Sequence, residues 1–389
     1  MGYEWYTLDD SLRKSEMVQG FESFIWTERY SAAGDFQIVT RSTSAARRFF
    51  VPDTFVGKND STYTMKIDTI TDEEDGAGNQ NLTIKGLAME NLFNDRVGYG
   101  AATDTTTTPN WTLAGTPGDV IRQMVQQVCV TGVLDPKDTI PFYHAGTLLP
   151  AGNIPEPSDI ITVVASLDYL YNSVKSVADA YNLGFRLVRD GDNSAVYFEV
   201  YTGSDRTTDQ STLPAVIFSP DMESLSQISQ LKSTALIKTV AYVYAANGFQ
   251  VVNAPLADST ATADKRRILL VNSNNQDPAG AGLDAALQQE GLLALASQQP
   301  IYAFDGVLPQ SLPYVYGKDY NLGDLVTEQA SDGYGNQMRV TEQIFVSDDQ
   351  GERAYPTLSV NQVITPGSWT SEGALTWSTI NPALTWSTA

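Results

Sequence analysis

The stretch "FIWTERYSAAGDFQIVT" at residues 24–40 decides how the first part of the chain folds. Two apolar arms flank a turn of small and polar residues, "SAAGD", which is typical of a β-hairpin. The first arm ends with Glu28 and Arg29, which stand between Trp26 and Tyr30. An acid and a base beside such large rings allow two interpretations: one face of the strand meets water, or the hairpin is a contact surface between protein chains.

The composition limits the kinds of site that the chain can form. Its 389 residues are enough for two to three domains with a sizeable core. A hydrophobic content of 42% is ordinary for a globular protein. Cys129 is the single cysteine, which excludes an internal disulfide, and with one histidine in the chain a Cys/His zinc site cannot form. We therefore expect no metal and no cofactor.

The net charge of the chain argues against tight binding of nucleic acid. Its 46 acidic and 24 basic side chains give a net charge of −22, whereas affinity for phosphate depends on lysine and arginine. A surface past which DNA slides without adhering remains compatible with this charge. The N-terminus lacks the features of a signal peptide, and no run approaches the ~18 apolar residues of a membrane span. We expect a product of the cytoplasm, unless it leaves as part of something larger, with no stable membrane insertion.

Residues 1–100 have the pattern of β-structure. The segment "TYTMKIDTI" at 62–70 alternates apolar and polar side chains, and the acidic turn "TDEEDGAGNQ" leads into a second strand, "NLTIKG". This turn lacks the spacing and the closing glutamate of an EF-hand, so we do not predict calcium binding there.

Residues 101–300 mix helices and strands. A helix is predicted from Thr116 to Gly132, because a threonine cap, a proline and an acid open it and a glycine ends it. Apolar side chains at helical spacing predict two further helices, at 167–181 and 281–298. Between the last two helices, "GFRLVRD" and "AVYFEVYTG" flank an Asp-Gly turn and predict a hairpin.

Residues 301–362 return to β-structure and resemble the first part of the chain. "GDFQIVT", "MKI", an acidic turn and "LTI" near the start are matched in order by "GDLVTEQ", "MRV", an acidic turn and "LSV" near the end. We predict a mainly β, α+β fold with two related small β-barrels, at 1–100 and 301–362, flanking an inserted mixed region at 101–300. Residues 363–389 are predicted to form an extended C-terminal arm.

A search for catalytic motifs finds none. The chain has no GxxxxGK[ST] phosphate loop, no GxSxG nucleophile turn and no HExxH zinc motif. His144 lies between prolines without a nucleophile motif to pair with it, and the acidic runs lie in turns. No catalytic residue is predicted.

Several blocks together resemble tail-tip hub proteins of long-tailed bacteriophages, the siphoviruses. These blocks are "IWTERYSAAGDFQI", "LTIKGLAMENLFNDRV", "LGFRLVRD" with "FEVYTGSDRT", "VIFSPDMESLSQ", and "YGKDYNLGDLVTEQ" with "MRVTEQIF". The resemblance runs from about residue 20 to 362. At 86–90 this chain has "GLAME", where the family usually has Gly-Arg-Ser-Leu-Glu.

The resemblance implies a structural part of the virion and not an enzyme. Hubs of this family form homotrimers whose six related barrels mate with a hexameric ring. The implied partners are the distal tail protein ring, the tape measure protein and other tail-tip or fibre proteins, with DNA present only in passage. The alternatives are a tail-associated cell-wall hydrolase and a carbohydrate-binding tail module. Candidate contacts between chains are Trp26, Glu28, Arg29, Tyr30, Asp35, Asp319, Tyr320, Trp369, Trp377 and Trp386.

The last 21 residues contain half of the chain's six tryptophans. "ALTWST" occurs twice, at 374–379 and 383–388, with an Asn-Pro break between the copies. Termini often fray, but exposed tryptophans promote adhesion. We therefore predict an arm that packs Trp369, Trp377 and Trp386 on a neighbouring subunit or on another tail-tip protein.

Overall fold

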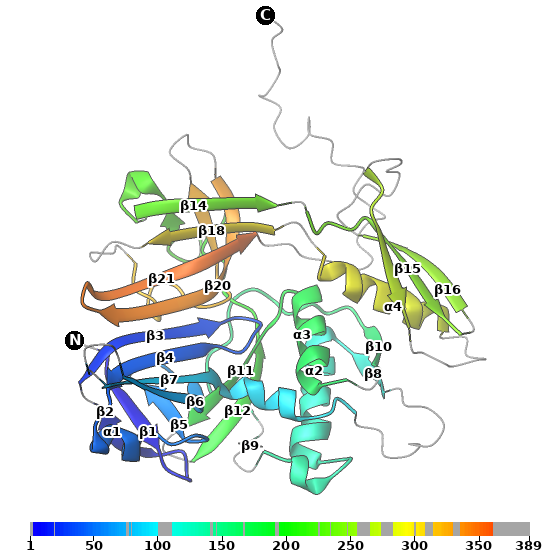
Figure 1. The fold of residues 1–389 in the computed structure, drawn as a ribbon. Coiled ribbons are helices and arrows are strands. Elements are labelled where there is room, and N and C mark those ends of the chain that lie inside the picture. Colours follow the sequence, from blue (N-terminus) through cyan, green and yellow to red (C-terminus); the bar gives the residue numbers. More distant parts are fainter. Residues whose placement is uncertain are drawn as a thin grey trace, which may run out of the picture.

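The computed structural model describes the chain from Tyr3 to Val360, with the gaps given below (Figure 1). Trp369, Trp377 and Trp386 lie outside the described residues, so the docking of the C-terminal arm stays a prediction. The described residues are 3–18, 20–74, 78, 80–99, 111–140, 143–144, 146–165, 168–190, 194–224, 226–233, 235–246, 248–254, 265–273, 283–298, 301–307, 314–329 and 335–360.

A 13-stranded sheet is the main element of the fold. Its strands are β1 (Trp5–Leu8), β2 (Lys14–Val18), β3 (Phe21–Arg29), β4 (Asp35–Arg41), β5 (Phe55–Lys58), β6 (Thr64–Glu74), β7 (Gln80–Ala88), β13 (Ile217–Phe218), β14 (Ser226–Ser233), β18 (Ile301–Val307), β19 (Leu325–Gln329), β20 (Gly335–Asp348) and β21 (Gly351–Val360). The order is β14-β18-β21-β20-β3-β4-β7-β6-β5-β1-β2, and β19 pairs with both β13 and β20. Figure 1 shows the blue N-terminal strands beside the orange C-terminal ones.

The two ends of the described chain join where β3 pairs antiparallel with β20, with Trp26 opposite Phe345. On its other edge β3 pairs with β4. A strand has two edges for hydrogen bonding, so β3 has none left to close a barrel from the N-terminal strands alone. In the described part of the chain no sheet closes on itself. The mainly β class is confirmed, but the expected pair of closed barrels is corrected to one continuous sheet.

The internal similarity holds for two hairpins. β6 with β7 and β20 with β21 are the long antiparallel hairpins that the matched segments predict. The third strand differs, because β4 joins the second strand of its hairpin, β7, whereas β19 joins the first strand of its own, β20. The likeness therefore does not extend to the whole arrangement. The division at residues 100, 300 and 362 stays a prediction, although β13 and β14, from within 101–300, belong to the large sheet.

Three smaller sheets and the longer helices occupy the middle of the chain. The sheets are β10-β8, β11-β12-β9 and β16-β15-β17. Their strands are β8 (Trp111–Gly115), β9 (Tyr143–His144), β10 (Ile161–Ala165), β11 (Gly184–Asp190), β12 (Ala195–Tyr201), β15 (Val240–Ala245), β16 (Gly248–Asn253) and β17 (Ile268–Asn272). The helices are α1 (Ser44–Phe49), α2 (Pro117–Val125), α3 (Leu170–Ala180) and α4 (Leu283–Ala296), with short helical turns η1 (Met89–Asp95), η2 (Gln126–Thr131), η3 (Pro136–Asp138) and η4 (Pro220–Met222).

The helix predictions are confirmed. The Thr116 hydroxyl accepts a hydrogen bond from the backbone N–H of Asp119 and caps α2. The π-helical turn η2 continues α2 to Gly132, whose left-handed backbone (φ 61°) ends the helix. α3 and α4 lie within the two other predicted ranges.

Apolar side chains form three clusters. One cluster lies between α2, α3 and β11-β12, and a second lies in the large sheet, where Trp5 and Trp26 meet edge to face at 5.3 Å. The third cluster joins α4 to β15 and β16. The second cluster takes residues from both ends of the described chain, so burial of apolar area fixes those ends together.

Candidate functional site at the junction of three sequence blocks

Three blocks that the sequence singles out meet at one place. They are "TERY" at 27–30, "GSDRT" at 203–207 and "DYNLGD" at 319–324, and we call their meeting point the junction. The ring of Tyr30 packs directly on Gly323, where a Cβ atom would overlap it. Segments far apart in the sequence are thus held in direct contact.

Glycines allow the backbones at the junction to touch. A Cβ atom on Gly203 would overlap the carbonyl of Gly323, and one on Gly152 would overlap the carbonyl of Gly203. Backbone hydrogen bonds reinforce this approach: the N–H of Leu325 donates to the carbonyl of Ser204 (2.9 Å). Close backbone approach of this kind is a role that only glycine fills.

A buried ion pair connects two of the blocks. Arg206 Nε donates to Asp324 Oδ2 at 3.0 Å, and the N–H of Ser204 donates to Oδ1 at 2.6 Å. Asp324 is 2% exposed. Burial raises the pKa of the Asp324 carboxyl above its ordinary value, although the N–H groups of Ser204 and Asn321 and the guanidinium of Arg206 act in the opposite direction. Removing one partner of such a pair leaves a buried charge uncompensated.

The Tyr30 hydroxyl connects the first block to the segments at Asn182 and Tyr201. It donates to the carbonyl oxygen of Asn182 at 2.8 Å, with that of Tyr201 at 3.2 Å. Arg339 Nη1 donates to the carbonyl of Gly323 at 2.5 Å and lies 3.5 Å from the Tyr30 hydroxyl. Burial raises the pKa of Tyr30 above its ordinary value, so the hydroxyl keeps the proton that it donates.

The charges that end β3 face partners within the chain. Glu28 is 2% exposed and accepts hydrogen bonds from Trp26 Nε1 (3.0 Å), Ser61 Oγ (2.5 Å) and Tyr316 Oη (2.9 Å). The acid is therefore a buried acceptor that orders the polar atoms of its aromatic neighbours.

Arg29 bridges the hairpin to the C-terminal strands. Its guanidinium pairs with Asp35 across the turn and with Glu342 of β20 at 2.6 Å. It also donates to the carbonyl of Ala33 at 2.9 Å. The Arg29 and Glu342 side chains remain about 30% exposed, so this pair fixes the register of β3 on β20 more than it stabilises the fold.

The other predicted contact residues have mixed locations. Asp319 accepts a hydrogen bond from the N–H of Val315 (2.8 Å), and Tyr320 is buried and donates to Gln343 (2.9 Å). The side chains of Trp26, Glu28, Tyr30 and Tyr320 thus face the interior of their own chain. A contact role between chains for the predicted set stays a prediction.

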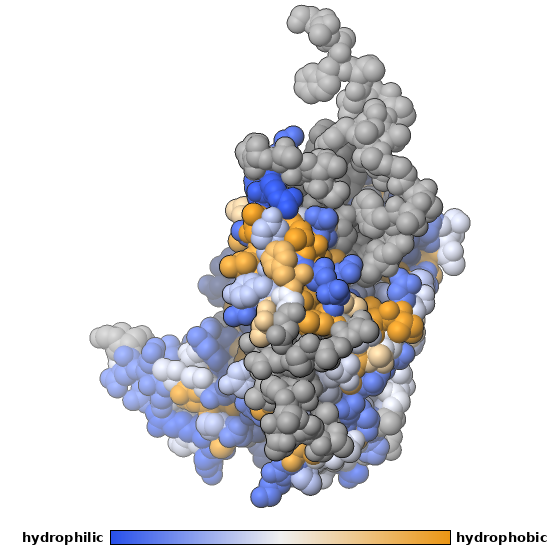
Figure 2. Space-filling view, turned by 90° about the vertical axis from the view of Figure 1, so that its right-hand side faces the viewer, coloured by the Kyte–Doolittle hydropathy of each residue, from blue (hydrophilic) through white to orange (hydrophobic). Residues whose placement is uncertain are grey.

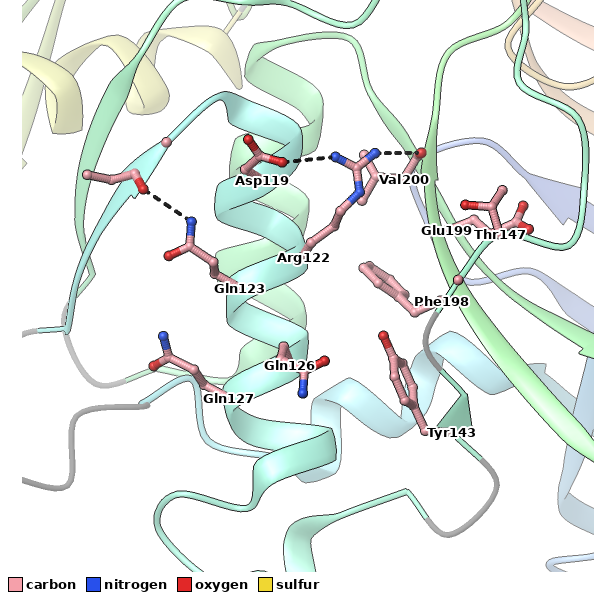
Figure 3. Close-up of a pocket in the computed structure, with 13 residues that line it drawn as sticks. Asp119, Arg122, Gln123, Gln126, Gln127, Tyr143, Thr147, Phe198, Glu199 and Val200 are labelled. Carbon is pink, nitrogen blue, oxygen red and sulfur yellow. Dashed lines mark hydrogen bonds and ion pairs between the residues drawn. The ribbon is translucent and has the colours of Figure 1, made fainter.

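A cleft of about 600 Å³ opens between α2 and β12. Figure 3 shows Gln123, Gln126 and Gln127 on the helical side and Tyr143 and Phe198 opposite them. Gln123 Nε2 donates to the carbonyl of Ala114 (3.1 Å), and Gln127 Oε1 accepts from Trp111 Nε1 (3.0 Å). The lining also includes Asp119, Arg122 and Glu199, so amide, aromatic and charged side chains all border the cleft.

The carboxylates around the cleft are bonded to arginines. Arg122 donates to Asp119 (3.4 Å) and to Glu156 (2.5 Å), and Arg186 Nε donates to Glu199 (2.9 Å). General acid–base hydrolysis needs one carboxyl that is free to carry a proton.

Two kinds of site are missing from the part of the chain that the structure describes. Within the described residues, no group of three or more His, Cys, Asp or Glu side chains is placed to hold a metal ion. None of the described helices combines the length and apolarity that crossing a bilayer requires.

Comparison with known proteins places the chain in a family. The sequence model of the siphovirus ReqiPepy6 Gp37-like proteins matches residues 4–358. The chain belongs to this siphovirus family. The match spans all three blocks of the junction, and the resemblance to siphovirus tail proteins is confirmed.

Solved structures show that this siphovirus protein has the fold of phage tail proteins. A tail protein from Neisseria meningitidis MC58 is 12% identical, with a TM-score of 0.56 over 93% of this chain and 98% of that one. The 43 kDa tail protein of prophage MuSo2 from Shewanella oneidensis is 13% identical, with a TM-score of 0.53 over 92% and 98%. The comparison with curated protein sequences finds no match.

Several residues that build the junction of this Gp37-like chain escaped sequence reasoning. Gly203, Arg206, Asp324 and Arg339 were not predicted as functional, although all four lie within the quoted blocks. A glycine followed within one to three residues by a charge, as in "GSDR" and "LGD", is the available signal. It shows that a close approach occurs, but not which two segments make it.

Proposed function

We propose that this protein is a structural component of a siphovirus tail, the hub that joins the tail tube and distal ring to the tip and the receptor-binding apparatus. The observation that carries the proposal is the family match over residues 4–358 together with a fold shared with phage tail proteins over nearly the whole chain. The hub position, the trimer and the residence in the virion rest on the sequence resemblance.

The architecture suits a part that holds other parts in place. One sheet runs through both ends of the described chain, and the junction locks it to the middle region by backbone contact and a buried ion pair. Close-packed interiors transmit force with little deformation. We propose that three copies form a ring, and that the distal tail protein, the tape measure protein and tip or fibre proteins bind around it.

The net charge of −22 supports a passive role toward DNA. A duplex that passes an acidic surface gains no counterion release and is repelled. We propose that DNA meets this protein only in passage and that the ring lines or closes the exit path.

Electron microscopy of the intact particle tests the hub. We expect a threefold ring with a central channel at the tail tip, labelled by an antibody fragment raised against this protein. Mass photometry of the purified protein with its distal-ring partner should give three copies. A single copy at the tip, or labelling elsewhere in the tail, contradicts the hub while leaving the tail assignment intact.

The cleft supports carbohydrate binding as a second candidate function. A saccharide ring stacks on an exposed aromatic face while its hydroxyls meet amides, and Tyr143 with the nearby glutamines offers both. We expect calorimetric titration with cell-wall oligosaccharides to show binding that Tyr143→Ala weakens about tenfold, which is about 1.4 kcal/mol. Tyr169→Ala, which changes an exposed tyrosine outside the cleft, should leave it unchanged. No binding by the wild-type protein contradicts this candidate.

A further inference from the structure

The sheet β16-β15-β17 carries apolar side chains on both faces. One face packs against α4 through Ala241, Val243, Val252, Leu287 and Leu295. The strand pairing places another set together on the opposite side, which we call the outer face. Its members are Tyr242, Tyr244, Phe249, Val251, Ile268 and Leu270.

The outer face is open in the described structure. Leu270 is 66% exposed, Phe249 is 54% exposed, and Val251, Ile268 and Tyr244 are 47%, 45% and 37% exposed. Figure 2 looks onto this side of the molecule and shows apolar residues gathered there. A sheet with one wet face alternates apolar and polar side chains, whereas apolar residues on both faces are typical of strands that are covered on both. A contiguous apolar patch of this kind marks an interaction surface.

We infer that the outer face binds the C-terminal segment of its own chain, residues 367–389, in place of the docking on a neighbouring subunit or another tail-tip protein that the sequence predicts for this arm. Within 361–389 the sequence has one charged side chain, Glu372, and three tryptophans. A tryptophan buries roughly 150–250 Å² when covered, so three of them match a patch of six large apolar residues. The repeated "ALTWST" presents two similar apolar units to that patch.

The described chain ends, at Val360, near the sheet that carries the outer face. Ser359, next to the end of β21, pairs with Ala303 of β18. β18 begins at Ile301, three residues after Gln298, where the described α4 region ends. The N–H of Lys238, just before β15, donates to the carbonyl of Gln298 (3.3 Å). The end of β21 thus lies near the base of the sheet (Figure 1). The 29 residues after Val360 reach up to about 95 Å when extended, and a tether this short gives a high effective concentration.

Charge at the margin of the outer face agrees with this occupant. Arg266 Nη2 donates to the Tyr242 hydroxyl (3.2 Å), and its guanidinium lies 5.9 Å from the ring centroid. It belongs to the basic run Lys265 to Arg267, in a chain with a net charge of −22. A strongly acidic partner would be repelled by most of this acidic chain. The C-terminal segment has Glu372 as its single charged side chain, so it meets little repulsion, and Glu372 is attracted to the basic run at the margin of the outer face.

Fluorine NMR of the full chain tests the inference. The six tryptophans are labelled as 5-fluorotryptophan and assigned by single Trp→Phe changes; Trp5, Trp26 and Trp111 are buried and serve as internal references. We expect the signals of Trp369, Trp377 and Trp386 to be shielded from a soluble paramagnetic agent, as the buried tryptophans are. Leu270→Asp should move these three signals to the positions of a free peptide of residues 367–389 and leave the references unchanged.

The matched control is Val51→Asp, which places the same charge on another exposed apolar side chain (48% exposed). It should leave all six signals in place. If Leu270→Asp disturbs the reference signals, Phe249→Ser is used instead. The shielding measurement on the wild-type chain tests the inference independently of both variants. Arm tryptophans as accessible as in the free peptide overturn the inference. Shielding that appears only with rising protein concentration, together with a multiple of the monomer mass, shows that a second copy is the occupant and also overturns it.

Discussion

Replacing Gly203 with alanine should lower the free energy of unfolding by roughly 3 kcal/mol or more, at the upper end of overpacking effects. The added Cβ atom would overlap the backbone carbonyl of Gly323. The Gly203 carbonyl accepts a hydrogen bond from Ile154, and the Gly323 N–H donates one to Val340, so this backbone cannot move away as a flexible side chain does. Strain should spread to the Arg206–Asp324 pair and to the Tyr30 ring, which share this contact. Urea denaturation followed by near-ultraviolet circular dichroism measures the loss.

Gly317→Ala is the matched control for this prediction. Gly317 has a left-handed backbone (φ +83°) and no atom within 4 Å of the added Cβ, so it reports the conformational cost alone, about 1–2 kcal/mol. Gly203 has no such backbone constraint but no space. A loss for Gly203→Ala no larger than that for Gly317→Ala contradicts the close approach of the three blocks.

Replacing Glu90 with glutamine should remove roughly 3 kcal/mol of pH dependence from the free energy of unfolding between pH 5 and 8. Glu90 is 1% exposed, and burial raises the pKa of its carboxyl from 4.5 to about 7. The N–H of Leu187 donates to Oε1 (2.6 Å) and Arg186 favours the charged form, but these effects do not offset burial.

The sign of the effect follows from proton binding. Below pH 4.5 both folded and unfolded states carry the Glu90 proton, and above about pH 7 neither does. Between these values the folded state keeps a proton that the unfolded state releases, so the free energy of unfolding falls as the pH rises. Glutamine keeps the acceptor for Leu187 and has no proton to lose, so the difference between wild type and variant should shrink or reverse toward pH 8. Parallel profiles from pH 5 to 8 contradict the raised pKa.

Local elements were predictable because neighbouring residues decide them. The cap at Thr116 and the glycine at 132 define the helix that contains α2, and alternation defines β6 and β7. The spacing of apolar residues likewise gave α3 and α4. Hydrogen bonds within a helix or a hairpin connect residues that are close in sequence. The residues that determine such an element therefore stand together in one short stretch of the sequence.

Long-range pairing was not predictable from the same signals. The repeated hairpins suggested two closed barrels. Whether a strand such as β3 closes a barrel with nearby strands or pairs with a distant strand depends on which strand edges are free in the folded chain. β3 uses both edges, one for β4 and one for β20, and this makes one sheet from the two ends of the described chain. Glu28 was ambiguous for the same reason. The sequence alone does not distinguish an acid on a solvent-exposed strand face from a buried hydrogen-bond acceptor, because the partners Ser61 and Tyr316 are distant in sequence.

The sequence by itself determined the class of the protein: mainly β, acidic, with no catalytic motif and with blocks that belong to a siphovirus family. Only the tertiary structure decided that "TERY", "GSDRT" and "DYNLGD" touch, and that a sheet near the end of β21 exposes an apolar outer face. The physical reason is that composition and periodicity report how each residue meets its neighbours in sequence. Contact between Gly203 and Gly323 depends instead on how whole elements pack. Glycine has no side chain from which its contact partner could be predicted.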